Sequence, residues 1–127
     1  MSTVLTAARP VAFVPSTDLE RSREFYEQAL GLQVVHADDF AVVLDANGFA
    51  IRVTDVGPDL RVQPFTVLGW AVDDVHAEIA ELRQRGVVSR RVNGIEQDEA
   101  GVWVAPGGTK VAWFTDPDGN TLSVSGG

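Results

Sequence analysis

The sequence predicts an α+β fold in which tandem βαβββ modules form a curved mixed sheet, shaped as a cup. Alternating apolar and polar residues, typical of strands, recur on both sides of one amphipathic helix in each half of the chain. Hairpin signals recur at one offset, Asn47-Gly48 and then Asp118-Gly119, and the same offset aligns residues 51–53 with residues 122–124. With 127 residues, the chain is expected to be a single domain, 1–127, with its own core.

The first module covers about residues 10–56. Its helix, residues 17–32, is predicted to begin with a capping box of Thr17 and Glu20 and to end at Gly31. Its four strands are expected at residues 10–16, 32–37, 40–46 and 49–55.

The second module covers about residues 65–125. Asp73 or Asp74 is predicted to cap its helix, which buries a line of apolar residues and ends at Gly86. That buried line consists of Val75, Ile79 and Leu82. The strands of this module are expected at residues 66–72, 87–92, 110–116 and 121–125, with a two-residue primed turn at Asp118-Gly119 before the last strand.

Each module has only one helix, which protects one face of its small sheet and leaves the other face uncovered. Two such modules must therefore face or adjoin one another, which predicts the cup. Alternate side chains of the first and fourth strands of each module are expected to line it.

Composition excludes several classes of function. The formal net charge is −8 and the ten Lys and Arg residues are scattered, which argues against a nucleic-acid partner. There is no Cys, and therefore no disulfide or thiolate metal site. No run of about 18 apolar residues and no apolar leader segment occurs, so no membrane partner is expected and a cytoplasmic location is predicted. The acidity suits either a cationic ligand or solvated surfaces.

Three segments carry a resemblance to a known family: DLERSREFYEQALGL, WAVDDVHAEIAELRQRGV and FTDPDGNTLSV. They resemble the vicinal oxygen chelate superfamily, which includes glyoxalase I, bleomycin-resistance proteins, fosfomycin-resistance enzymes and extradiol dioxygenases. The resemblance covers residues 10–125 and implies a glyoxalase-like fold. It also implies that catalytic members hold a divalent metal through His or Gln and Glu side chains on the first and fourth strands of each module.

Carried over to this chain, those metal positions are Val11, Arg52, Val67 and Ser123. Only Ser123 has a side chain able to ligate, and poorly, so the resemblance implies no metal site and no cofactor here. His36, on a predicted strand, and His76, in the first turn of the second helix, are expected to be structural or surface residues because neither has a nearby partner in sequence.

Arg52 is the most informative of these residues, because it puts a fixed cation where the family holds an anion. It could hold a carboxylate or phosphate of a small molecule bidentately. Two alternatives stay open: pairing with an internal Asp or Glu, or a one-residue register slip that turns Arg52 to the surface.

Aromatic residues are the other candidates for the lining. Phe13 is predicted to share a face with Val11, whereas Trp103 and either Trp113 or Phe114 are expected near the mouth or wall of the cup, unless they belong to the core. Trp103 follows the polar loop 93–101 and is expected on a mobile flap. The acidic residues of this flap, Glu96, Asp98 and Glu99, attract a cation or keep the loop solvated.

The sequence thus predicts a metal-independent protein that binds a small organic molecule, an antibiotic or a metabolite, as bleomycin-resistance proteins do. The expected ligand-binding residues are Phe13, Arg52, Val67, Trp103, Trp113 and Ser123, and no catalytic residue is identified. Two other functions stay open: a lyase, isomerase or dioxygenase of the same superfamily, and an interaction domain with an unused cup. A homodimer is expected because exposed strand edges favour pairing.

Overall fold

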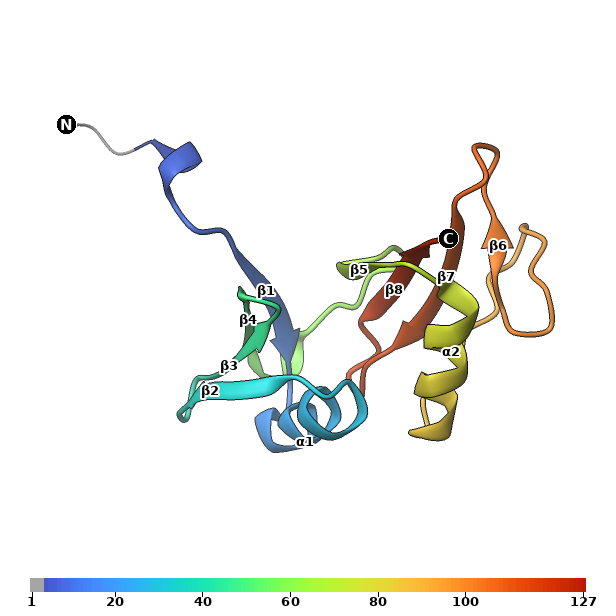
Figure 1. Cartoon of the computed structure of the whole chain (residues 1–127). Coiled ribbons are helices and arrows are strands. Elements are labelled where there is room, and N and C mark those ends of the chain that lie inside the picture. The colour runs from blue at the N-terminus through green and yellow to red at the C-terminus, as the bar shows by residue number, and fades with distance from the viewer. Residues whose placement is uncertain (1–3) are drawn as a thin grey trace. The chain divides into compact units, whose positions relative to one another are not determined.

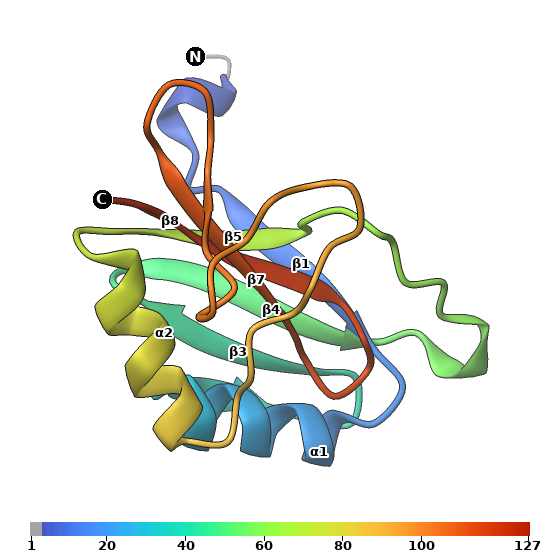
Figure 2. The ribbon, with the colours of Figure 1, turned by 90° about the vertical axis from the view of Figure 1, so that its right-hand side faces the viewer.

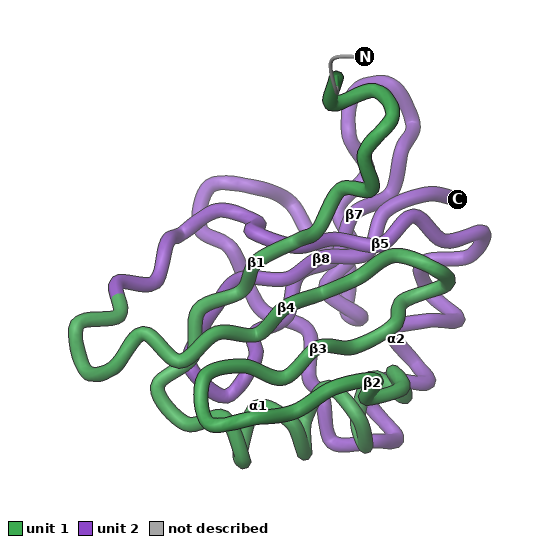
Figure 3. Tube along the Cα trace, turned by 90° about the vertical axis from the view of Figure 1, so that its left-hand side faces the viewer, with its two compact units in different colours: residues 1–60 green, residues 61–127 purple. Residues whose placement is uncertain are grey.

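The computed structural model describes residues 4–127, and these form two compact units, unit 1 up to Leu60 and unit 2 from Arg61 (Figure 1, Figure 3). Each unit has its own four-stranded mixed sheet, in the order β1-β4-β3-β2 in unit 1 and β5-β8-β7-β6 in unit 2. In both units the first strand is parallel to the fourth, and the other neighbours are antiparallel. The predicted repetition of an α+β module is confirmed.

Unit 1 contains a short 3-10 turn at Leu5–Ala7, the strands, one helix and a second 3-10 turn at Gly57–Asp59. The helix begins as α1, Leu19–Glu24, and continues as one π-helical turn, Phe25–Ala29, in which the amide of Leu30 donates to the carbonyl of Phe25. The strands are β1 (Val11–Ser16), β2 (Gln33–Ala37), β3 (Ala41–Ala46) and β4 (Phe49–Asp55).

Unit 2 contains one helix, α2, Val75–Gln84, which packs against β7 and β8 (Figure 1). Its strands are β5 (Leu68–Val72), β6 (Trp103–Val104), β7 (Lys110–Thr115) and β8 (Thr121–Gly126). The chain between α2 and β6 forms an irregular loop (Figure 2).

Alternation across each sheet separates a packed face from an open face. In unit 1, α1 packs against β3 and β4, and the hydroxyls of Ser16 and Ser22 hydrogen-bond at 2.7 Å between strand and helix. Val14 on β1 and Tyr26 on the helix are fully buried in this core. The buried apolar side chains of the two central strands are Val42, Leu44, Ile51 and Val53. Their neighbours in sequence therefore point to the opposite, open face.

The core of unit 2 repeats this pattern. Val75, Ile79 and Leu82 are buried on α2, as predicted. The buried apolar side chains on the sheet are Ala112, Phe114, Leu122 and Val124. Trp70 stacks on Phe114 with ring centroids 6.4 Å apart, so Phe114 belongs to this packed face and cannot line a cup on the other face.

The helix caps differ in part from the prediction. Asp18, and not Thr17, caps the first helix, because the helix starts one residue later and the Asp18 carboxylate accepts from the amide of Arg21. The predicted capping box of Thr17 and Glu20 was therefore wrong. In α2 the structure selects Asp74 from the two predicted candidates, since its carboxylate accepts from the amide of Ala77 at 3.0 Å.

The two hairpins also differ from one another. Asn47 and Gly48 both have positive φ, 54° and 83°, as the predicted primed turn requires. In the second hairpin only Gly119 has positive φ, so the predicted two-residue primed turn at Asp118-Gly119 was wrong. The strands instead separate after Thr115↔Thr121, because the carboxylate of Asp116 accepts from the amides of Asp118 and Asn120 and holds a wider loop.

Residues 87–92 do not form the predicted strand. One ladder-like hydrogen bond joins the amide of Arg90 to the carbonyl of Trp113. The neighbouring backbone groups are taken by the Gln97 side chain, whose amide oxygen accepts from Val92 N and whose amide nitrogen donates to Arg90 O. A side-chain amide thus replaces a partner strand, and β6 occupies the sheet edge at Trp103–Val104 instead.

The Asp74 cap gives a test of how the second module is organised. Asp74→Ala is expected to lower the free energy of unfolding by about 1 kcal/mol, because the amide of Ala77 loses its acceptor. Asp73→Ala removes the same charge from the neighbouring position, and it is expected to change the free energy of unfolding by less than about 0.5 kcal/mol. Urea denaturation of both variants measures the difference, and equal losses would contradict the assignment of the cap.

Candidate functional site

The open face of unit 1 brings Phe13 and Arg52 together. Phe13 on β1 is the register partner of Arg52 on β4, which in turn pairs with Val43 on β3, so the three side chains form one row across the sheet. Phe13 is 65% exposed, whereas Arg52 is partly buried. Val11 and Thr54 belong to the same face by alternation.

Arg52 points away from the packed face, because its neighbours Ile51 and Val53 are buried there. The register slip left open by the sequence is therefore excluded. Within residues 4–127, Arg52 makes no ion pair with an Asp or Glu, so the other alternative, an internal pair, is excluded for the described part of the chain.

The open face of unit 2 brings together Ser123, Trp113 and Trp103, and Val67 lies just before its first strand. Ser123 on β8 lies between Gly69 on β5 and Trp113 on β7. A Cβ at position 69 would approach the Ser123 Oγ to 2.9 Å, so the absence of a side chain at Gly69 makes room for this hydroxyl. The amide of Val67, just before β5, donates to the carbonyl of Thr121.

The two tryptophans of this face stack on one another, with ring centroids 6.0 Å apart and planes inclined by 29°. Trp103 pairs with Val111 in the β6–β7 ladder, and it therefore lies on a strand and not on the predicted mobile flap. The stacked pair forms a flat apolar surface next to the hydroxyl of Ser123.

The side chains at the four family metal positions do not fit a divalent ion. The structure places Val11 and Arg52 on the open face of unit 1 and Ser123 on that of unit 2, whereas Val67 lies just before β5, where its amide donates to the carbonyl of Thr121. Valine has no donor atom, a guanidinium repels a cation, and a serine hydroxyl is a poor ligand beside the imidazole and carboxylate groups that such sites use. Among residues 4–127, no cluster of three or more His, Asp or Glu side chains is placed to hold a metal.

Each histidine has an acidic partner, which the sequence prediction missed. The Nε2 of His36 lies 2.9 Å from Asp38, and that of His76 lies 2.7 Å from Asp98. Hydrogen bonds from His36 and from the amides of Phe40 and Ala41 lower the pKa of Asp38 to about 2. Asp38 follows His36 by two residues, so the sequence did contain a signal for the His36–Asp38 pair.

Asp98 organises the loop 93–101. Its Oδ1 accepts from the amides of Ala100 and Val102, and its Oδ2 meets the ring of His76 on α2. The hydrogen bond from His76, together with those from Val102 and Ala100, lowers the pKa of the Asp98 carboxyl. The predicted flap is thus fastened to the helix by one carboxylate.

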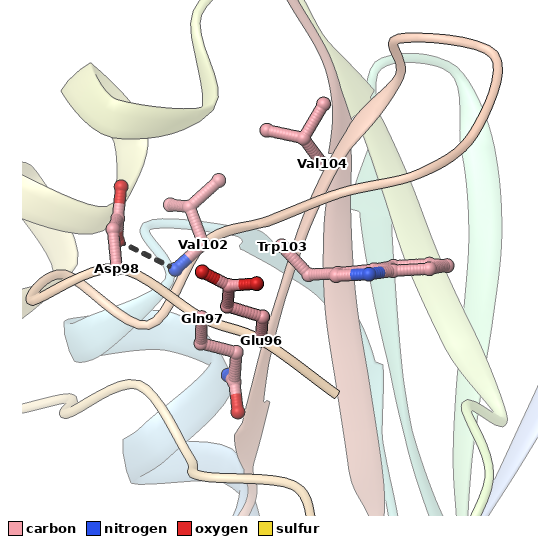
Figure 4. A pocket seen from close by; sticks show the side chains of 6 residues that line it. All are labelled: Glu96, Gln97, Asp98, Val102, Trp103 and Val104. Atoms are coloured by element: carbon pink, nitrogen blue, oxygen red, sulfur yellow. Dashed lines mark hydrogen bonds between the residues drawn. The ribbon is translucent and has the colours of Figure 1, made fainter. Parts of the chain in front are cut away.

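Two hollows in unit 2 lie beside the stacked tryptophans and differ in charge. The first, about 380 Å³, is acidic and is lined by Glu96, Gln97, Asp98, Val102, Trp103 and Val104 (Figure 4). The second, about 560 Å³, is basic and is lined by Pro64, Phe65, Thr66, Arg90, Arg91, Val92, Asn93, Trp113 and Thr121. One indole of the stacked pair contributes to each hollow.

Sequence reasoning missed Arg90 and Phe65 as candidate site residues. Arg90 was assigned to a strand and counted among scattered charges, and Phe65 lay in a connecting loop. The adjacent pair Arg90-Arg91, in a chain of net charge −8, was the available signal. No helix among residues 4–127 has the length and apolar character needed to cross a membrane.

Comparison with known proteins supports the fold. The model of the glyoxalase/bleomycin resistance protein/dioxygenase superfamily matches residues 8–124. TnmS3, an antibiotic binding protein from Streptomyces sp. CB03234, is similar in structure with a TM-score of 0.67 and 23% identity, over 94% of this chain and 95% of that chain. Lactoylglutathione lyase from Agrobacterium tumefaciens has a TM-score of 0.66 and 20% identity, over 95% and 94%. UcmS2 has a TM-score of 0.72 and 18% identity, over 95% and 98%. The search of curated proteins found no match.

The His76–Asp98 contact predicts a pH effect. A carboxyl whose pKa is lowered in the folded state stabilises the fold above its unfolded pKa of about 3.9, and this stabilisation is lost as the pH falls through the folded pKa. His76→Ala is expected to raise the pKa of Asp98 towards, but not to, its ordinary value, because the amides of Ala100 and Val102 remain. Carbon-detected NMR titration of the Asp98 carboxyl measures this shift.

The matched control is His36→Ala, which removes the other histidine and its partner contact with Asp38. It is expected to leave the pKa of Asp98 unchanged. An unaltered pKa of Asp98 in His76→Ala, or equal shifts in both variants, would contradict the role given to the contact.

Proposed function

This chain belongs to the glyoxalase/bleomycin resistance protein/dioxygenase superfamily, and we propose that it binds a small organic molecule without a metal ion. The observation that carries the proposal is the set of side chains at the four family metal positions, two valines, an arginine and a serine. Removing the donors abolishes the Lewis acid site, but the open faces keep apolar and hydrogen-bonding surface suited to a ligand.

The proposed binding surface consists of two groups of residues. Phe13 and Arg52 share a row on the open face of unit 1. Trp103, Trp113 and Ser123 share the open face of unit 2, and Val67 lies just before β5. We propose that each group is a ligand-contacting surface of a single domain. The rings supply flat apolar contact, and Arg52 and Ser123 supply orientation through hydrogen bonds.

The proposed role is sequestration of an antibiotic or metabolite in the cytoplasm. The structural similarity to TnmS3, described as an antibiotic binding protein, supports this choice. An enzymatic role like that of the similar lactoylglutathione lyase has less support, because no general base lies within hydrogen-bond distance of Arg52 in residues 4–127.

A homodimer is also part of the proposal. In the sheet of unit 1, β1 has a neighbour on one side only, and it carries the exposed side chains of Val11 and Phe13. An edge strand with apolar side chains favours pairing with a second copy. Light scattering at several protein concentrations tests this part separately.

The proposal predicts binding that does not depend on metal. A panel of aromatic antibiotics and carboxylates, screened by thermal shift and followed by calorimetry, is expected to give at least one ligand whose affinity is the same with and without EDTA. Elemental analysis of the purified protein is expected to find no stoichiometric zinc, nickel, manganese or iron. Stoichiometric metal, together with loss of binding in EDTA, would contradict the proposal and favour the enzyme.

Arg52→Ala is expected to weaken an anionic ligand found in this screen by about tenfold or more, the usual cost of a lost charged hydrogen bond. Arg23→Ala is the matched control, because it removes an exposed guanidinium from the helix of unit 1, where Arg23 makes a surface ion pair with Glu27 at 3.8 Å. Equal effects of both substitutions would remove Arg52 from the proposed surface.

A further inference from the structure

The basic hollow of unit 2 differs from the rest of the molecule in charge. The chain has a net charge of −8, yet the residues around this hollow include two arginines and no Asp or Glu. The acidic hollow, which Trp103 lines, has the opposite composition: it contains Glu96 and Asp98 and no Lys or Arg. A guanidinium in a concave site selects an anion through its fixed fork of N–H donors.

Arg90 is held in place at both its backbone and its side chain. Its amide donates to the carbonyl of Trp113, which fixes the residue next to the indole. Its Nη1 donates to the hydroxyl of Thr121 at 3.2 Å, and that hydroxyl, on a residue only 2% exposed, donates in turn to the carbonyl of Gln63. The guanidinium is therefore oriented before any ligand arrives, which reduces the entropy lost on binding.

The other donors of Arg90 are available. Within residues 4–127, its guanidinium makes no ion pair and has one hydrogen bond, the one to Thr121. A guanidinium carries five N–H groups. Arg90 therefore keeps enough free N–H groups to donate to both oxygens of a carboxylate.

Arg91 contributes differently. Its guanidinium donates to the backbone carbonyls of Gln97, Asp98 and Glu99, and so it fastens the acidic loop. Those carbonyls are uncharged, so the positive charge of Arg91 remains at the hollow, although its donors are engaged. Arg90 is thus the residue with donors left for an anion, and Arg91 strengthens the local positive potential.

Two aromatic rings line the same hollow. Trp113 belongs to the stacked pair of the sheet, and Phe65 is 61% exposed on the segment that leads to β5. A large exposed ring beside a cation is typical of a surface that binds a flat molecule with an acidic substituent.

We propose that this hollow binds a flat aromatic organic anion, with Arg90 pairing with its carboxylate and with Trp113 and Phe65 contacting its ring. The inference rests on the proposed function and deepens it, because it assigns the charge and shape of the ligand. It also adds Arg90 and Phe65 to the binding residues.

The test compares 2-naphthoate with its uncharged analogue 2-naphthamide, by calorimetry on the full chain in EDTA. The wild-type protein is expected to bind naphthoate at least about tenfold more tightly than the amide, and Arg90→Gln is expected to remove this difference. NMR is expected to show that naphthoate shifts the indole N–H signal of Trp113 and leaves that of Trp70, which lies on the packed face, unchanged.

Two further variants keep the test decisive if Arg90→Gln fails to fold. Phe65→Ala changes an exposed side chain and is expected to weaken naphthoate several-fold with no loss of stability. Arg23→Gln, on the helix of unit 1, is the matched control and is expected to change nothing.

The inference is overturned if naphthoate does not bind, if the amide binds equally well, or if folded Arg90→Gln or Phe65→Ala binds naphthoate like the wild type. Loss of naphthoate binding in Arg52→Gln but not in Arg90→Gln would place the anion on unit 1, overturning this inference and leaving the proposed function intact. Binding of any ligand that requires a bound metal would contradict the proposed function itself.

Discussion

The structure depends on one constraint: each four-stranded sheet has a single helix, and a helix can cover only one face. The alternation of strand side chains then divides every strand into a packed set and an open set. Ile51 and Val53 fix the register of β4 because a slip of one residue would expose both of them. Arg52 lies between them and consequently points to the open face. The apolar core therefore determines the direction of the Arg52 side chain.

This constraint also explains why the metal positions can change without loss of the fold. Val11, Arg52 and Ser123 alternate with the buried apolar residues of their strands and so point away from the packed faces. Exchanging a carboxylate for a guanidinium or a hydroxyl at such a position alters the chemistry of the face and leaves the packed set intact. Fold membership is therefore compatible with several different functions.

The periodic parts of the molecule could be predicted from the sequence, because they depend on local patterns. The strands of unit 1, the buried line of α2 and the primed turn at Asn47-Gly48 are of this kind. The prediction of a strand at residues 87–92 was wrong for a non-local reason, since Gln97 supplies the hydrogen bonds that a partner strand would supply. The second turn failed because the Asp116 carboxylate, outside the dipeptide, determines its width.

The same distinction applies to the candidate site. Phe13, Arg52 and Ser123 could be assigned to a face by counting residues along strands, whereas Arg90 enters its hollow only through contacts with Trp113 and Thr121, far away in the sequence. The overall acidity was compatible with a cationic ligand or with solvated surfaces, and at physiological ionic strength charges beyond about 8 Å are largely screened. The guanidinium of Arg90, on an exposed residue that lines a hollow without carboxylates, acts within that distance. The sign of the ligand is therefore decided by the few groups that line the hollow, and the net charge of the chain does not oppose an anion there.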